Sequence, residues 1–334
     1  MGELRREALV MTPQPQVCDP NALGDARAVR FDRGALCDIL AHVTEHRDWS
    51  AQTLYAGQLA SWLHARLRAR LIERYLHYFV LVTRHGTYID GFAGPQAPEH
   101  PETWSAKRVL ESRPRFLRHF FLCELDDVKI TMLEALWATQ PPRDGKESKR
   151  DCTILAGDFN TTVDRVLQSG VITEKEATFA LLDQRTFECH WSTVKKLATH
   201  KTEGNKIELF YFLAVKWLHR AIAGTLTSEY RIDDWWGGDG WKAIKLQNQL
   251  KMAIDVTQRF KTELGYKYAN PFPIREKEDG GGSVMYYMIH ASDHPAAPGL
   301  MRRAYDQAIQ PEDAPKQATI TFPEPEESLD DERI

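Results

Sequence analysis

The sequence has few cysteines and no long apolar run, and these shortages exclude several classes of protein. The five cysteines, at positions 18, 37, 123, 152 and 189, are odd in number, and no two of them form a C-x-x-C pair. This argues against a disulfide framework or a structural zinc site and favours a reducing cytosol. The apolar run around "YFVLV" is too short to cross a bilayer, and charged residues stand where a signal peptide would be apolar. We therefore expect a cytoplasmic protein without a membrane partner.

A strong net charge is also missing. The formal net charge is −4 over 334 residues, so global charge alone does not indicate a nucleic-acid partner. The composition, 43% hydrophobic and 27% charged, is that of an ordinary globular protein. Acids and prolines gather at the end, in "TFPEPEESLDDERI", which predicts an acidic disordered tail over residues 311–334. Residues 1–53 lack strong periodicity and are interpreted as an N-terminal extension.

The remaining chain alternates between two kinds of segment. A long amphipathic helix is predicted in "TLYAGQLASWLHARLRARLIERYLHYFVLVTRHG". After it, strand-like runs at 87–90, 119–124, 152–158, 177–183, 207–215 and 284–294 alternate with helix-like segments. Such alternation predicts a mostly parallel sheet with helices on both faces. We therefore predict an α/β fold, a Rossmann-like doubly wound sheet over residues 54–310. A helical insertion at about residues 216–265 and a C-terminal helical addition complete it.

A carboxylate ends each of the first four strand-like runs: Asp90, Glu124, Asp158 and Asp183. In an open parallel sheet, ligands bind beyond the carboxyl ends of the strands. Four independent helix caps would be the purely structural explanation. As a ligand site, Glu124 suits two ribose hydroxyls, and Asp158 in "GDFN" suits the amino group of a base that stacks on Phe159.

The stretch "GTYIDGFAGPQ" decides between two nucleoside ligands. Its glycines would let the backbone approach a ligand, because no Cβ intrudes. A dinucleotide fingerprint needs a third glycine, and the chain has Pro95 and Gln96 there instead. Asp90 would repel a pyrophosphate but suits a cation. S-adenosylmethionine carries an ammonium and a sulfonium, so the charge favours it over NAD.

These motifs resemble a known family. "YIDGFAGP" resembles the first motif of class I S-adenosylmethionine-dependent methyltransferases. Together with "ARLIERYLHYF", "FALLDQRTFECHW" and "YYMIHASDHPAAPGLMRRAY", it is more closely similar to the three-Cys-motif partner (TcmP) proteins. The resemblance covers about residues 55–310. It implies a class I methyltransferase-like fold and a separate partner, a three-cysteine-motif protein similar to radical S-adenosylmethionine enzymes.

The resemblance also implies a role for each matching residue. Asp183 matches the first residue of the fourth motif, whose carboxylate accepts a hydrogen bond from the target amine in amino-methyltransferases. The chain has "DQRTF" where that motif has Asp-Pro-Pro-Phe, so Phe187 lies one residue late. We take Asp183, Arg185 and Phe187 as the candidate catalytic residues. The implied cofactor-binding residues are Asp90, Gly91, Phe92, Ala93, Gly94, Glu124, Asp158 and Phe159.

Other polar and aromatic groups allow two interpretations each. Glu188 or His190 could accept a proton, and Arg185 could bind a phosphate or carboxylate, or all three could be solvated. The stripe Arg66, Arg70 and Arg74 could bind an anion or face water. "DDWWGGDGW" (233–241) could stack on a flipped base or form a satellite core. His290, Asp293 and His294 lie on a strand-like segment, where their spacing does not support a metal site, and we predict no metal.

Two functions remain open at this point. The first is an S-adenosylmethionine-dependent methyltransferase, with a nucleic acid as the leading acceptor because of the arginines and tryptophans. The second is a non-catalytic module that binds a three-cysteine-motif protein, which the altered fourth motif favours. A metal-dependent nuclease fits less well, because no lysine follows Asp183 at the spacing such sites use.

Overall fold

The computed structural model describes residues 49–141, 150–216, 218, 229–244, 247–275 and 282–310, with side chains from residue 65 onward. The chain divides into two compact units, Met1–Tyr55 and Ala56–Ile334. The first unit and the predicted tail fall almost entirely outside the described residues, so the predicted extensions do too. Everything below concerns the second unit.

Six helices and the first five strands follow the predicted alternation closely. They are α2 (Trp49–Thr83), β1 (Gly86–Asp90), α3 (Ser105–Glu111), β2 (Leu117–Glu124), α4 (Asp127–Ala138), β3 (Asp151–Ala156), α5 (Phe159–Leu167), β4 (Thr178–Leu182), α6 (Trp191–Thr199), β5 (Glu208–Leu213) and, near the end, α10 (Ala297–Ala308). Between β5 and the last two strands lie α8 (Glu229–Trp236), the 3-10 helix η3 (Asp239–Ile244) and α9 (Gln249–Thr262). The short 3-10 helix η2 (Pro101–Thr103) precedes α3. None of the helices within these described ranges is both long and apolar enough to cross a membrane.

A seven-stranded sheet is the centre of the fold, and its strand order is β3-β2-β1-β4-β5-β7-β6. The first five strands pair in parallel, and β7 (Val284–Ser292) pairs antiparallel with both β5 and β6 (Tyr268–Arg275). The chain therefore places β1 between β2 and β4, and strand order reverses there. This arrangement confirms a mixed α/β fold with a mostly parallel sheet, and it is compatible with the predicted Rossmann-like, methyltransferase-like fold.

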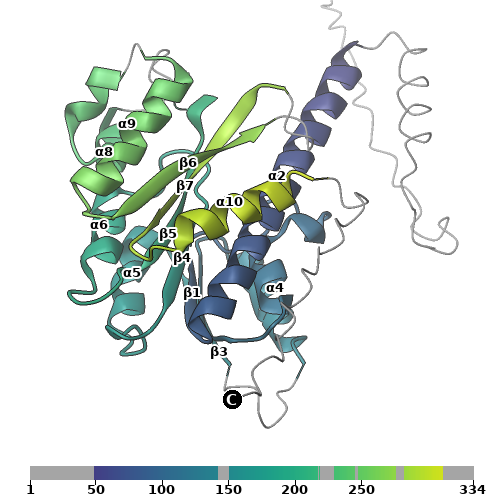
Figure 1. Ribbon diagram of the computed structural model, residues 1–334. Coiled ribbons are helices and arrows are strands. Elements are labelled where there is room, and N and C mark those ends of the chain that lie inside the picture. The colour runs from purple at the N-terminus through teal and green to yellow at the C-terminus, as the bar shows by residue number, and fades with distance from the viewer. Residues whose placement is uncertain are drawn as a thin grey trace, which may run out of the picture. The chain divides into compact units, whose positions relative to one another are not determined.

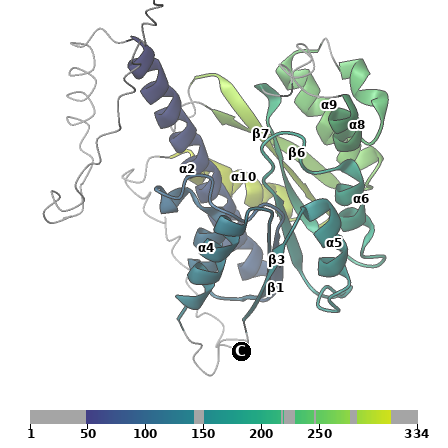
Figure 2. The same cartoon turned by 180° about the vertical axis from the view of Figure 1, so that it is seen from behind.

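Helices cover both faces of the sheet, as Figures 1 and 2 show, with α2, α4 and α10 on one side and α5, α6, α8 and α9 on the other. Successive strand residues point to opposite faces, so a strand buried on both faces reads as a continuous apolar run. In β4, Phe179 and Leu181 pack on the α2 side, while Ala180 and Leu182 pack on the α5 side. A hydrophobic core thus lies on each face of the sheet, and β4 contributes alternate side chains to both cores.

Strand β6 was missing from our prediction, and its prolines explain why. Proline lacks the N–H that a sheet interior needs, so "YANPFPIR" did not read as a strand. The strand lies at the edge, where Pro271 and Pro273 pair with Ile289 and Tyr287 of β7. Since the two prolines are two residues apart, both turn the same backbone edge outward. The Tyr305 hydroxyl donates to the Pro273 carbonyl at 2.5 Å, which satisfies one outward-facing acceptor.

The basic stripe expected on α2 is not a solvated face. Arg70 is buried, and its guanidinium donates to the Gln310 carbonyl at 2.7 Å. Arg74 is exposed and Arg66 is half-buried, so the three do not form one open surface. Between Leu67 and Val80 the helix buries apolar residues in the core on this side of the sheet, and its Tyr78 hydroxyl donates to Gln307 of α10 at 3.0 Å. The nucleic-acid hypothesis loses its first observation here.

Candidate functional site

A cleft of about 780 Å³ lies at the carboxyl ends of β1 to β4, next to the point where strand order reverses. This is the place where open α/β sheets bind ligands, and the volume is within the range of small-molecule sites. The predicted residues that line it are Gly91, Phe92, Gly94, Glu124, Asp158, Phe159, Asp183, Arg185 and Phe187. The remaining two predicted residues, Asp90 and Ala93, line a recess of about 10 Å³ that shares Phe92, Gly94, Gln96 and Asp183 with the cleft.

Asp90 lies deeper than the other acids because β1 ends early. In the sheet Asp90 is level with Leu122 of β2 and Leu181 of β4, so β2 and the β4 loop reach two residues further to Glu124 and Asp183. The loop after β1 then closes over Asp90, whose exposure is 1%. Its carboxylate accepts from the Phe92 N–H at 3.1 Å and from the Tyr88 hydroxyl at 2.9 Å. Asp90 therefore lies beneath the cleft and lines the small recess below it.

Burial also changes the charge of Asp90. Desolvation disfavours the ionised form and raises the pKa of Asp90 to about 7. The Phe92 N–H opposes this rise, and the nearby Asp183 carboxylate adds to it. The phenol of Tyr88, buried beside it, has a pKa well above its usual value for the same reason, loss of water. Asp90 therefore changes protonation near neutral pH.

Asp183 is paired with a cation that the sequence did not point out. Arg68 of α2 places its Nε 3.1 Å from Asp183 Oδ2, and both side chains are 7% exposed. Burial raises the pKa of Asp183, and the Arg68 charge opposes that rise. The Arg68 guanidinium also lies 4.9 Å from the centre of the Phe212 ring. Asp183 Oδ1 is buried and has no hydrogen-bond partner among the described residues, so one acceptor of the site is unused.

The two glycines of the first loop are required by neighbouring side chains. A Cβ on Gly91 would come within 2.7 Å of the Phe159 ring, and a Cβ on Gly94 within 2.2 Å of Glu124 Oε2. Separations below 3.0 Å cannot be accommodated without movement of one partner. We predicted that these glycines admit a ligand. The structure adds a second reason for them, because they also let the loop pack closely against Glu124 of β2 and Phe159 of α5.

Glu124 is held by three backbone N–H groups. Its Oε2 accepts from Gly94 at 2.8 Å, and its Oε1 accepts from Leu125 at 2.9 Å and Asp126 at 3.1 Å. A carboxylate offers about four acceptor positions, so Glu124 keeps room for about one more strong hydrogen bond. It can bind one hydroxyl in the way we predicted, whereas the second hydroxyl needs another partner.

The third strand end, Asp158, caps a helix and still faces the cleft. Asp158 Oδ1 accepts from the Asn160 backbone N–H and side-chain amide, both at 2.9 Å, which satisfies the start of α5. Its other oxygen has no bond among the described residues and is available to a ligand. Phe159 is buried under Gly91, with its ring centre 6.0 Å from that of Phe92. The half-buried Phe92 is the more accessible of these two aromatic rings.

Asn160 ties the third strand end to the fourth. Its amide donates to the Glu188 carbonyl at 2.7 Å, and its oxygen accepts from the His190 N–H at 2.9 Å and the Thr193 hydroxyl at 2.8 Å. The Asn160 side chain thus joins the start of α5 to the 183–190 loop and to α6. Asn160 stands in "GDFN", and we predicted no role for it from the sequence.

The fourth-motif residues face different environments. Arg185 is exposed, and its N–H donates to Glu188 Oε2 at 2.7 Å, which forms a local turn. Phe187 is 8% exposed, and its ring lies edge-on to Trp235 with centres 5.3 Å apart. His190 is half-buried at the start of α6 and lines the cleft. Phe187 is therefore mainly a core residue, while Arg185 and His190 reach the cleft.

The tryptophans of "DDWWGGDGW" belong to the core on the α5 side of the sheet. Trp235 and Trp241 are buried, and the Trp241 N–H donates to Asp233 at 2.7 Å. Arg259 of α9 lies between Trp191 and Trp236, 3.9 and 4.1 Å from their ring centres. These aromatic faces are occupied, so they offer no platform for a base. The exposed aromatic residue of this region is Tyr230, which lines the cleft from α8.

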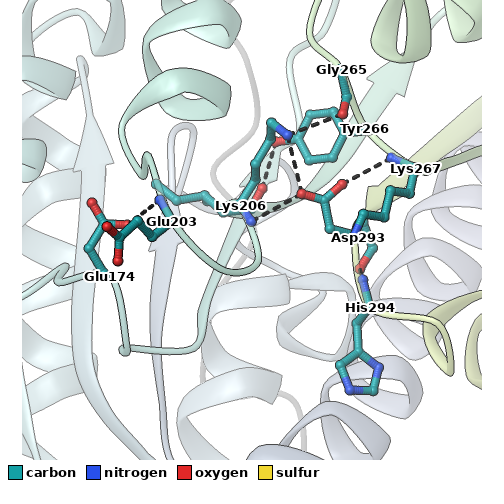
Figure 3. Close-up of polar contacts among 10 residues, drawn as sticks. Glu174, Glu203, Lys206, Gly265, Tyr266, Lys267, Asp293 and His294 are labelled. Atoms are coloured by element: carbon teal, nitrogen blue, oxygen red, sulfur yellow. Dashed lines mark hydrogen bonds and ion pairs between the residues drawn. The ribbon is translucent and has the colours of Figure 1, made fainter.

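No group of three or more histidine, cysteine, aspartate or glutamate side chains suits a metal ion within the described ranges. His290 is buried and lies 2.7 Å from Glu208. Asp293 accepts from the Lys267 N–H at 2.9 Å and from Lys206, while the His294 ring points away from it (Figure 3). Asp293 thereby joins the segments that precede β5 and β6. The His-Asp-His spacing is thus structural.

Comparisons with known proteins add little to this geometry. No family model matches the chain, and no curated protein matches it. The crystal structure of the DszA carbon methyltransferase is similar over 63% of this chain, with 15% identity and a TM-score of 0.33. This chain spans 47% of the length of that structure. A likeness of this size decides neither fold nor function, and the similarity to the three-Cys-motif partner family stays a prediction.

Proposed function

We propose that the chain binds S-adenosylmethionine in the cleft and transfers its methyl group to an acceptor beside Asp183. The observation that carries this proposal is the charge of the cleft. Six acids line it, Glu124, Asp126, Asp158, Asp183, Glu188 and Asp234, against the three bases Lys129, Arg185 and Arg231. Such a lining favours a cationic nucleoside and opposes the pyrophosphate of a dinucleotide.

The residues present fit a nucleoside of this kind. Glu124 and Asp158 each keep an acceptor for a hydroxyl or an amino group, and they come from adjacent strands. Leu125, which is 71% exposed, and Phe92 offer apolar contact to a planar base. The unused Oδ1 of Asp183 is an acceptor on the opposite side of the lining. The exposed Leu125 is otherwise unexplained by packing.

The chemistry asks mainly for alignment. When bound, the cofactor supplies a methyl group made electrophilic by its sulfonium. The chain's own part is to hold the two reactants in line, and alignment of this kind contributes about 7–11 kcal/mol to a barrier in favourable systems. Asp183 Oδ1 would accept an N–H or O–H of the acceptor and so orient its lone pair. His190 would take up the proton released at the mouth.

The acceptor class follows from the same lining. We predicted a nucleic acid, but Arg70 is buried, the tryptophan faces are occupied, and the cleft is acidic. An acidic mouth repels phosphates. We therefore place an uncharged or cationic acceptor, such as an amine or a protein side chain, ahead of a nucleic acid.

Binding is tested by isothermal titration of the full-length protein with S-adenosylmethionine and, separately, with NAD. We expect saturable binding of the first alone. The Glu124→Gln variant should weaken it about tenfold, since a charge-assisted hydrogen bond is worth about 1.5–3 kcal/mol. Exposed Glu203, in the loop that leads into β5 at the amino ends of the parallel strands, provides the matched control Glu203→Gln. Binding of NAD in preference would refute the assignment.

A second function has one observation in its favour. Phe187 is 8% exposed and packs edge-on against Trp235, so little of its ring is left for an acceptor. This supports a module that keeps the nucleoside site without turnover and binds the three-cysteine-motif protein implied by the resemblance. Incubation with tritiated-methyl S-adenosylmethionine and pools of amines, protein, RNA and DNA distinguishes the two. Label transfer that is lost in Asp183→Asn supports the enzyme, and binding without any transfer supports the module.

A further inference from the structure

The recess below the cleft joins two buried carboxylates and one buried arginine. Its volume, about 10 Å³, is enough for about one water molecule. Arg68 from α2, Asp90 from β1 and Asp183 from the β4 loop all line it, and all three side chains are more than nine-tenths buried. The three groups would carry a net charge of −1 with both carboxylates ionised, in a place that water scarcely reaches.

A buried charge has to be paired or neutralised. Asp90 has two neutral donors, Tyr88 and the Phe92 N–H, and no cation in contact. Asp183 has Arg68 at 3.1 Å on Oδ2 and nothing on Oδ1. Asp90 is therefore stabilised by neutral donors alone, whereas Asp183 has a cation beside it. Burial raises the pKa of both, but the Arg68 charge opposes the rise only at Asp183.

We propose that Arg68 is a positioning residue for this cleft, which holds Asp183 ionised through Oδ2 and leaves Oδ1 as the fixed acceptor for a ligand N–H or O–H. The proposal rests on the proposed function for the identity of that ligand. It adds a residue outside every motif of the sequence, on the helix before β1. The Arg68 guanidinium also lies over the Phe212 ring, and this contact helps to hold it in place.

Several other charged groups face the same carboxylates. Glu188 raises the pKa of Asp183 and Arg185 lowers it, while Glu124 adds to the rise at Asp90. Arg185 and Glu188 are exposed, so solvent screens them. Arg68 is the buried cation of the set, and its removal should therefore have the largest effect on the protonation of Asp183.

The test is a ligand-free ¹³C NMR titration of the full-length protein labelled at the aspartate carboxyl carbon. Asp90→Asn and Asp183→Asn variants assign the two resonances. In Arg68→Met we expect the titration midpoint of Asp183 to rise by at least one pH unit, and in Arg68→Lys to return most of the way. Arg70→Met is the matched control, because Arg70 is a buried arginine of the same helix that contacts the Gln310 carbonyl.

An unchanged Asp183 midpoint in Arg68→Met, or an equal shift in Arg70→Met, would overturn the proposal. If Arg68→Met does not fold, the double variant Arg68→Met/Asp183→Leu decides. It should fold, because removing both members of a buried pair is often tolerated. A double variant that also fails to fold makes Arg68 a core anchor and refutes the positioning role. The titration contains no ligand. A failure to bind S-adenosylmethionine would therefore refute the proposed function without changing the Asp183 titration midpoints.

Discussion

Single residues at the cleft are fixed by contacts too close to admit one more carbon atom. Gly94 shows this most clearly, because its N–H donates to Glu124 while its Cα lies against the same carboxylate. The close approach leaves no room for a side chain. The loop is thereby seated on β2 before any ligand arrives, which is the preorganisation that a binding site needs.

Gly94→Ala should therefore weaken both stability and the site. The new Cβ would meet Glu124 Oε2 at 2.2 Å and Lys129 Cδ at 2.7 Å, so either the loop or these two side chains, and with them the Gly94–Glu124 hydrogen bond, must move. We expect a loss of about 1–3 kcal/mol in the free energy of unfolding and weaker ligand binding. Gly299→Ala in α10 is the control, since its Cβ meets nothing within 4 Å. It should gain about 0.5–1 kcal/mol. Urea unfolding measures both, and equal effects would contradict the account.

Asp90 makes stability depend on pH in a definite direction. Its folded pKa of about 7 exceeds the unfolded value of roughly 4. The folded state therefore holds a proton that the unfolded state has lost, and stability falls as pH rises between these values, by roughly 4 kcal/mol at most. Asp90→Asn removes this loss. Its stability relative to the wild type should rise from pH 4 to 7 and then level off. A difference that stays constant over pH 4 to 8 in urea unfolding would rule out the assignment.

At the scale of elements, the cleft depends on the loop of residues 183–190, which joins β4 to α6. The 183–190 loop follows β4 and is held by Gln184, whose amide contacts Phe212 and Cys189, and by Asn160 of α5. Without those ties the loop would carry Asp183 on a flexible support. Element boundaries here were predictable, since Trp191 begins α6 where the periodicity begins, but the ties between elements were not.

Asn160→Ala should loosen that loop. The substitution leaves the Glu188 carbonyl, the His190 N–H and the Thr193 hydroxyl without this partner. We expect a loss of about 1–3 kcal/mol and faster amide exchange at His190 and its neighbours. Hydrogen exchange followed by mass spectrometry measures it, with Thr161→Ala at the next, exposed position as the control. Unaltered exchange across 184–190 would show that Asn160 does not hold the loop.

The sequence predicted which segments form helices and strands better than it predicted where each strand ends within the sheet. Alternating apolar runs located five parallel strands, because a doubly covered strand is apolar on both faces. It missed β6, whose prolines suit only an edge, and the strand's edge position is decided by the whole sheet. It also placed Asp90 beside its fellow acids, whereas the register sets it two residues deeper. Arg68 was missed because its partner, Asp183, is distant in sequence.

At the scale of the whole described unit, the carboxyl and amino ends of the parallel strands carry different features. The carboxyl ends hold the cleft, and the amino ends hold a buried polar cluster. Glu208, at the start of β5, accepts from Tyr75 of α2, from His290 and from Ser292 of β7. Burial, followed by the Glu208 charge, raises the pKa of Tyr75 well above its usual value, so the phenol stays a donor. This cluster fastens α2 to the sheet.

Tyr75→Phe should therefore destabilise the unit without touching the site. It removes a charge-assisted hydrogen bond worth about 1.5–3 kcal/mol and keeps the ring packing. Tyr305→Phe is the control, because its hydroxyl bonds a neutral carbonyl and should cost about 0.5–1.5 kcal/mol. Thermal unfolding gives the stabilities and titration calorimetry the affinity. A large change in cofactor affinity for Tyr75→Phe would mean that the two ends are coupled.

The most direct test of the account is hydrogen exchange of the full-length protein with and without S-adenosylmethionine. A ligand in the cleft contacts the loops after β1, β2, β3 and β4 together. We predict slower exchange in residues 91–96, 124–129, 157–160 and 183–190, and no change near Lys201–Glu208 at the amino ends. Slowing confined to the amino ends, or none at all at saturating cofactor, would contradict a cofactor site at the acidic strand ends.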